Sequence, residues 1–235
     1  MSDDLPIAEK RAAILERMSE AAKLAGTHGA TLVAVSKMQP NARIAEMLAA
    51  GQKVFGENRV QEAQKRWGET FAAHCDDIEL RLIGPLQTNK AEDAVALFDV
   101  IETLDREKLA KALVKAAEKV GRMPRLLVQV NTGEEDQKSG IAPPDVGDFL
   151  TLLKDNYDFI PEGLMCIPPQ GEAASPHFWL LKKLADRHGL KTVSMGMSRD
   201  YETAIELGAT HVRVGSALFG ERDYSLIETR IPVAR

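Results

Sequence analysis

The chain has 235 residues, 44% hydrophobic and 28% charged, with a formal net charge of -5 at pH 7, as in a globular protein with one sizeable core. That charge gives no general attraction for nucleic acid or an anionic membrane, no stretch approaches the roughly 18 apolar residues of a membrane span, and the acidic start lacks a signal-peptide pattern. Cys75 and Cys166 match no metal-ligand spacing and no disulfide framework, so we expect a cytoplasmic protein. The length predicts one domain over residues 1–235.

Helix and strand signals alternate along the chain. Pro6 and Gly26 bound a first helix whose apolar stripe includes Ile14, Met18 and Ala22. Short apolar runs predict strands at 31–36, 53–55, 79–83, 99–102, 125–130, 159–165, 191–194 and 211–214. Helices are predicted between them at 41–50, 58–67, 88–97, 105–120, 144–155, 175–188 and 199–207.

Strands separated by helices favour parallel pairing through crossover connections. About eight such units in this length predict a single (β/α)₈ TIM-type barrel with an extra N-terminal helix. A doubly wound open sheet is the alternative, but no G-x-G-x-x-G follows a strand, which disfavours its dinucleotide-binding version. The loop at 168–175 is expected to lie at the barrel rim.

Active sites of such barrels lie at the carboxyl ends of the strands. Lys37 follows Val33 and Val35 on one face of the first strand by the period-two rule, so it continues an apolar row at that end. Burial there would depress the pKa of the amine and make it a nucleophile toward carbonyls. The alternative is a strand-end lysine whose amine extends into solvent.

The last two strands end in segments suited to an anion. Residues 194–198 read Ser-Met-Gly-Met-Ser, and Gly215 and Ser216 follow the final strand. Glycine lets backbone N–H groups approach a phosphate, serine adds a hydroxyl donor, and the helix predicted to start near Arg199 would add its N-terminal dipole. The alternative is that these residues form only caps and tight turns. A lysine opposite a phosphate site is the arrangement that pyridoxal 5'-phosphate (PLP) requires.

Arg213 lies between two valines in the last strand and faces opposite to them. It could donate to the pyridine nitrogen of PLP and, being permanently charged, would leave that nitrogen unprotonated. Equally, it could be an interior arginine paired with a carboxylate from a neighbouring strand.

Three further features are weaker. Asn58 follows the second strand and could be a helix cap or a cofactor contact. Residues 84–90 resemble a phosphate loop, but Asn89 replaces a glycine that nucleotide binding needs. The five histidines show no ligand spacing, so no metal site is expected.

Seven segments in order resemble the PLP homeostasis protein family. They are Leu32–Met38, Phe55–Glu62, Leu82–Lys90, Val130–Gly140, Gly163–Met165, Ser194–Ser198 and His211–Gly220. The resemblance implies a barrel like the N-terminal domain of alanine racemase, with PLP held as an internal aldimine on Lys37. The cofactor-binding residues that we expect are Lys37, Asn58, Met195, Ser198, Arg213, Gly215 and Ser216.

Within the resemblance, Arg213 matches an arginine at the pyridine nitrogen, and Ser198, Gly215 and Ser216 match a phosphate cup. Asn58 matches an asparagine beside the cofactor. Three positions depart from the common pattern, namely Met38 and Ser216 in place of threonine and Arg199 in place of aspartate. Ser216 keeps a hydroxyl and an N–H, whereas Arg199 changes the charge of the rim.

The expected function is non-catalytic: PLP binding in intracellular vitamin B6 and amino-acid homeostasis, by a monomer with PLP-dependent apoenzymes as recipients. The alternative is a PLP-dependent racemase or decarboxylase of the same fold type. Only about 15 residues follow Gly220, so no second domain is expected, and no second base is found to oppose Lys37 as two-base racemisation requires. A cofactor-free aldolase using Lys37 is a third possibility.

Overall fold

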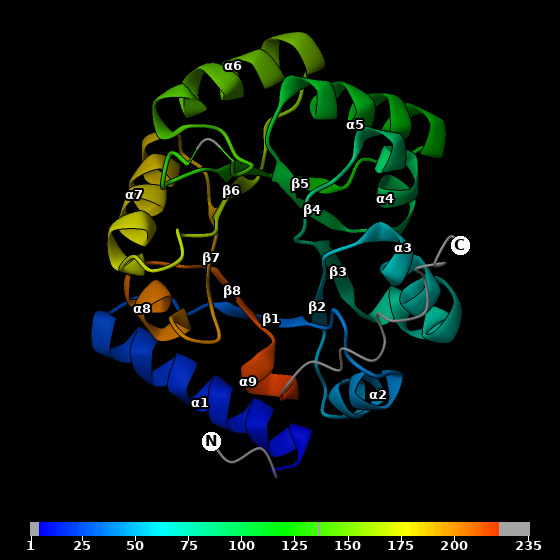
Figure 1. Cartoon of the computed structure of the whole chain (residues 1–235), viewed down its shortest axis with the longest axis vertical. Coiled ribbons are helices and arrows are strands. Elements are labelled where there is room, and N and C mark those ends of the chain that lie inside the picture. Colours follow the sequence, from blue (N-terminus) through cyan, green and yellow to red (C-terminus); the bar gives the residue numbers. More distant parts are fainter. Residues whose placement is uncertain (1–4, 136, 221–235) are drawn as a thin grey trace, which may run out of the picture.

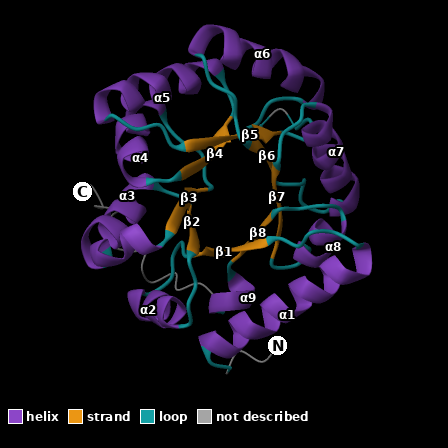
Figure 2. Ribbon diagram, turned by 180° about the vertical axis from the view of Figure 1, so that it is seen from behind, coloured by secondary structure: helices purple, strands orange, loops and turns teal. Residues whose placement is uncertain are grey.

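The computed structural model describes residues 5–135 and 137–220. Eight parallel strands form a closed barrel in chain order, surrounded by helices (Figures 1 and 2). The strands are β1 (Thr31–Val35), β2 (Val54–Glu57), β3 (Glu79–Leu82), β4 (Val100–Leu104), β5 (Arg125–Val130), β6 (Gly163–Cys166), β7 (Thr192–Met197) and β8 (His211–Val214). Since β8 pairs directly with β1, the barrel prediction is confirmed and the open doubly wound sheet is wrong.

The α-helices are α1 (Ile7–Ala25), α2 (Asn41–Ala49), α3 (Val60–Ala63), α4 (Ala91–Leu97), α5 (Glu107–Val120), α6 (Val146–Tyr157), α7 (Ala174–Arg187), α8 (Tyr201–Glu206) and α9 (Ser216–Phe219). The extra N-terminal helix is α1, which packs against α8 and α9 outside the barrel (Figure 1). It ends at Gly26, whose φ of 67° lies in the left-handed region that favours glycine. Among the described residues, no helix is long and apolar enough to cross a membrane.

Two predicted elements are wrong in extent. The helix predicted at 58–67 is the short α3 followed by a π-helix at Gln64–Thr70 and a 3₁₀-helix at Ala72–Asp77. The strand predicted at 159–165 begins only at Gly163, because Pro161 has no N–H for a sheet ladder. The apolar run before it, at 159–160, belongs to the connection, where Ile160 is 69% exposed.

The strands separate two apolar layers. Leu32 and Ala34 belong to the large core between the barrel and its helices, whereas Val100, Leu127 and Met165 form a small cluster by themselves. Alternate side chains of a strand point to opposite faces, so this second cluster lies inside the barrel.

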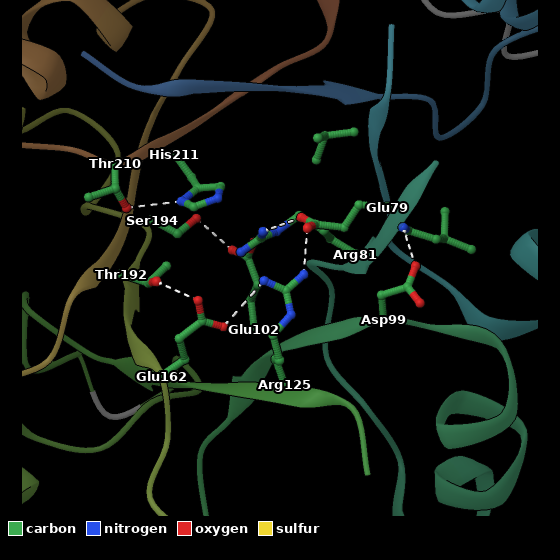
Figure 3. A network of polar contacts seen from close by, with 12 residues as sticks. Glu79, Arg81, Asp99, Glu102, Arg125, Glu162, Thr192, Ser194, Thr210 and His211 are labelled. Atoms are coloured by element: carbon green, nitrogen blue, oxygen red, sulfur yellow. Dashed lines mark hydrogen bonds and ion pairs between the residues drawn. The ribbon is translucent and has the colours of Figure 1, made fainter. Parts of the chain in front are cut away.

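A polar network also occupies the interior of the barrel (Figure 3). Glu102 of β4 is fully buried and accepts hydrogen bonds from Arg81 Nε at 2.6 Å and from Ser194 Oγ at 2.6 Å. Burial alone would raise the pKa of Glu102, but the charges of Arg81 and Arg213 outweigh it and lower that pKa below its ordinary value. Glu102 is therefore an ionised carboxylate between two arginines.

At the amino-terminal end of the barrel, His211 places Nδ1 2.9 Å from Thr210 Oγ1 (Figure 3). Burial, reinforced by the positive charge of Arg81, lowers the pKa of His211 to about 4 from 6.5. Between pH 6.5 and pH 4, His211 is protonated in the unfolded chain but neutral in the folded one. The stability that neutral His211 contributes is therefore fully present above pH 6.5 and is lost as the pH drops toward 4.

We expect His211 to contribute a loss of up to about 3 kcal/mol in the free energy of unfolding over that range. Urea unfolding at about pH 7.5 and about pH 4.5 measures it, with His211→Gln as the comparison, because glutamine carries no titrating proton in this range. Equal pH dependence in the two proteins would show that His211 is not responsible.

Candidate functional site

The carboxyl ends of β1, β7 and β8 meet at one sector of the barrel rim, because β8 pairs with both of its neighbours. Arg213 is in register with Val33 of β1 and with Met197 of β7. A Cβ added at Gly215 would lie 3.4 Å from Val35 Cβ, so the segment after β8 runs close beside the end of β1. Closure of the barrel thus brings the segment that holds Lys37 to the segment that holds Gly215.

Lys37 lies in a turn immediately after β1 and is half-buried. Gln39 N donates to Ser36 O at 3.2 Å, which closes the turn, and Ser36 N donates to Gly56 O of β2 at 3.0 Å. Met38 has a φ of 56°, a left-handed conformation that a residue with a side chain seldom adopts. The turn therefore has a defined and unusual backbone conformation.

The predicted phosphate residues lie together. Ser198 Oγ accepts hydrogen bonds from Gly215 N at 3.3 Å and Ala217 N at 3.4 Å, which joins the end of β7 to the start of α9. Ser216 is the first residue of α9 and is exposed. Ser198, Gly215 and Ser216 thus form a single cluster of hydroxyl and backbone N–H groups, which is suited to an anion.

Met195 is also among the predicted cofactor-binding residues. Its side chain is fully buried in the core between the barrel and the helices. Contact between Met195 and a ligand at the rim would have to come from its main chain. The next residue, Gly196, has a φ of 89°, and a Cβ there would lie 2.5 Å from Ala204 Cβ, so this position requires glycine.

Arg213 is buried beneath the rim with its guanidinium held by three groups. Nη1 donates to Ser194 Oγ at 2.7 Å, Nη2 donates to Cys166 O at 2.7 Å, and Glu102 Oε2 is 3.8 Å from Nη1. The interpretation of Arg213 as an interior, carboxylate-paired arginine is therefore correct in part, although Glu102 comes from β4 and not from a neighbouring strand. Donation to a pyridine nitrogen stays a prediction.

Asn58 follows β2 and carries the clearest sign of a missing partner. Its Oδ1 is buried and has no hydrogen-bond partner among the described residues. Leaving a buried acceptor unpaired costs about 1–3 kcal/mol, so a ligand donor at this place would stabilise the site. Together with the Lys37 amine and the hydroxyl and N–H cluster at Ser198, it fits a ligand with an aldehyde and an anionic group.

The position of Asn58 depends on Gly84, which follows β3. A Cβ added at Gly84 would lie 2.3 Å from Asn58 O and 2.8 Å from its Cα. We expect Gly84→Ala to lower the free energy of unfolding by about 1–3 kcal/mol, because backbone must shift to make room.

The control is Gly68→Ala, where an added Cβ meets nothing within 4 Å. That variant should be as stable as the wild type or slightly more stable, because alanine favours helix over glycine. Chemical denaturation measures both, and equal stability of the two variants would contradict the close packing of Gly84 on Asn58.

Two rim loops are tied by a residue that the sequence did not single out. His177 of α7 places Nδ1 3.2 Å from Thr132 O, in the loop after β5, and Nε2 3.1 Å from Glu172, in the loop after β6. The predicted rim loop at 168–175 is thus attached to its neighbour, although its last two residues belong to α7. Among the described residues, no group of three or more His, Cys, Asp or Glu could hold a metal ion.

The sequence did not single out Glu102, nor did it indicate that Ser194 and Glu102 hold Arg213 from inside the barrel. A signal was present. Glu102 is an acidic residue in a strand whose other members are Val100, Ile101, Thr103 and Leu104. Ser194 lies on the same face of its strand as Gly196 by the period-two rule. A buried carboxylate implies a cationic partner, and Arg81 and Arg213 are the buried arginines of β3 and β8 that supply it.

Comparison with known proteins identifies the family. The family model described as alanine racemase, N-terminal domain, matches residues 10–223. A curated protein of Pseudomonas aeruginosa named pyridoxal phosphate homeostasis protein is 42% identical over 229 residues, which cover 93% of this chain and 96% of that protein. A relative of the same name from Aquifex aeolicus is 39% identical over 229 residues, covering 92% and 98% of the two chains.

The chain is thus of the class built on an alanine racemase N-terminal barrel. Within that class, it belongs to the pyridoxal phosphate homeostasis protein family.

Solved structures support both statements. The structure of PipY from Synechococcus elongatus with PLP bound has a TM-score of 0.77 and 36% identity, covering 91% of this chain and 100% of that one. Alanine racemase from Acinetobacter baumannii has a TM-score of 0.65 at 18% identity, covering 89% and 61% of the two chains, a likeness of fold.

Proposed function

We propose that this protein binds PLP at the rim between β1 and β8, with the cofactor joined covalently to Lys37 Nζ. The observation that carries the proposal is the placement of the Lys37 turn beside the cluster of Ser198, Gly215 and Ser216. PLP supplies an aldehyde, which condenses with a primary amine and releases one water molecule. The PLP bound by the Synechococcus elongatus relative supports the same ligand here.

Each predicted residue then has a defined task. The hydroxyl of Ser198, with the backbone of Gly215 and Ser216, would hold the phosphate, and the main chain of Met195 would flank it. Arg213 would face the pyridine nitrogen from below, since Ser194 and Cys166 fix its two terminal nitrogens. Asn58 would use its unpaired Oδ1 toward the ring or its substituents.

The role we propose is non-catalytic: intracellular storage and delivery of PLP by a cytoplasmic monomer, with PLP-dependent apoenzymes as recipients. The names of the curated relatives support homeostasis over catalysis. Racemisation needs a base on each face of the substrate carbon, and two of the three tyrosines lie elsewhere, Tyr157 on α6 and Tyr201 buried in α8. Tyr224 lies outside the described residues.

The test is to incubate PLP-loaded protein with single enantiomers of several amino acids and to follow optical activity and release of carbon dioxide. We expect no sustained turnover. Turnover near the median of ordinary enzymes, about 10 s⁻¹, would establish a racemase or decarboxylase instead. A purified protein that forms no yellow adduct with added PLP would favour the cofactor-free aldolase.

A further inference from the structure

Behind the Lys37 turn lies a buried carboxylate that no step of the proposed binding uses. Glu57 ends β2, shares a strand face with Phe55, and its side chain is fully buried. Its Oε1 accepts hydrogen bonds from Ser36 Oγ at 2.7 Å, Arg66 Nη1 at 2.5 Å and Trp67 Nε1 at 3.1 Å. Glu57 thus contacts the residue that directly precedes Lys37.

Arg66 holds the other end of the same turn. Its Nη2 donates to Gln39 O at 2.8 Å, while Nη1 pairs with Glu57. Lys37 and Met38 are therefore the only residues between two anchored positions, Ser36 and Gln39. The left-handed φ of 56° at Met38 is costly for a residue with a side chain, and such conformations persist where surrounding contacts enforce them.

The local structure that supplies these contacts is unusual. Arg66 and Trp67 are consecutive residues of the π-helix Gln64–Thr70, and both reach the same carboxylate oxygen. The Trp67 ring lies 4.8 Å from the Phe55 ring between centroids, which fixes the indole against β2. Short π-helical segments are rare and often occur at functional sites.

Stability alone gives a poor reason for this pair. Replacing a buried ion pair with well-packed apolar residues is often neutral or stabilising by about 1–4 kcal/mol. Glu57 Oε2 is also buried without a hydrogen-bond partner among the described residues, which adds a cost. The pair does fix the orientation of the Lys37 turn, because Glu57 binds Ser36 at one end of the turn and Arg66 binds Gln39 at the other.

We propose that the Glu57–Arg66 pair is a positioning device that fixes the Lys37 turn so that the amine points to the bound aldehyde. The inference rests on the proposed function, in that Lys37 is the residue that condenses with PLP. Glu57 and Arg66 act through the turn and do not touch the cofactor. Without them, the amine would still be present, but it would spend less time in the reactive direction.

Three variants test the device: Ser36→Ala, Glu57→Gln and Arg66→Met. Ser36→Ala removes one hydroxyl and is the least disruptive to the fold. The control is Asp186→Asn, which breaks the exposed i,i+4 pair between Lys182 and Asp186 on α7. The measured quantities are the rate of adduct formation with PLP, followed by absorbance and borohydride trapping, and the affinity for pyridoxine 5'-phosphate, which has no aldehyde.

The expected result is a split between the two measurements. Adduct formation should slow by about tenfold or more in the three variants, because an amine in the wrong direction loses effective concentration at the aldehyde. Affinity for pyridoxine 5'-phosphate should stay within about twofold of wild type, because the proposed phosphate site is formed by the segments that follow β7 and β8. Asp186→Asn should match the wild type in both measurements.

Unchanged rates in all three variants overturn the inference. So does a parallel fall in the rate, the pyridoxine 5'-phosphate affinity and the melting temperature in every variant including Ser36→Ala, because that pattern indicates a purely structural role. If wild-type protein is trapped on another side chain, or not at all, the proposed function itself is wrong. If the wild type is trapped at Lys37 and the three variants form the adduct at the wild-type rate, the inference is wrong but the proposed function stands.

Discussion

Replacing Lys37 with alanine is expected to abolish the covalent adduct with PLP and to leave the barrel folded. The side chain of Lys37 is half-buried in a turn at the rim, outside the two apolar layers, so its removal opens no cavity in either core. The phosphate cluster around Ser198 and Gly215 should still hold PLP without the covalent link. Intact mass after borohydride reduction measures the adduct, and equilibrium dialysis measures residual binding.

The matched control is Lys90→Ala. Lys90 also follows a barrel strand, β3, but its amine lies 3.4 Å from Asp93, and β3 pairs with β2 and β4, not with β1, β7 or β8. This variant should form the adduct as the wild type does. An adduct retained in Lys37→Ala and lost in Lys90→Ala would show that Lys90 carries PLP and would contradict the assignment to Lys37.

Replacing Glu102 with alanine should cost about 3–5 kcal/mol of the free energy of unfolding, because it removes the buried carboxylate that Arg81 and Arg213 share and leaves Arg81 with Glu79 alone. Arg81 is 1% exposed and donates to Glu102 at 2.6 Å, and Arg213 lies 3.8 Å away from it. Ser194 Oγ would lose its acceptor as well. Urea unfolding at neutral pH measures the loss.

The control is Glu92→Ala, whose partner Lys119 lies at 2.6 Å, with the two side chains 52% and 68% exposed. Exposed pairs contribute about 0–1 kcal/mol, so this variant should unfold close to the wild type. Similar small losses in both variants would mean that Glu102 is not the ionised centre of the barrel interior.

Much of the fold could be predicted from the alternation of apolar runs and helical stripes. The strand bounds at 125–130 and 211–214 agree with the structure, because both runs are rich in β-branched or leucine side chains and end at polar or glycine residues. The π-helix at Gln64–Thr70 could not be predicted, because it places Arg66 and Trp67 so that both donate hydrogen bonds to Glu57 at the end of β2. Local patterns carry no such information.

The site could be predicted as separate strand ends but not as an assembly. Lys37 and Gly215 are 178 residues apart (215 - 37), and only closure of the barrel through β1 and β8 makes them neighbours. The partners of Arg213 come from β4, β6 and β7, so no spacing in the sequence identifies them. Met195 belongs to the predicted segment Ser194–Ser198, but the period-two rule places its side chain opposite to that of Ser194, in the outer core.

The covalent chemistry assigned to Lys37 is tested most directly by peptide mapping of wild-type protein that has been loaded with PLP and reduced with borohydride. We predict a pyridoxyl-phosphate group on the peptide that contains Lys37 and on no other. Modification of a different side chain, or no modification at all, would contradict the account.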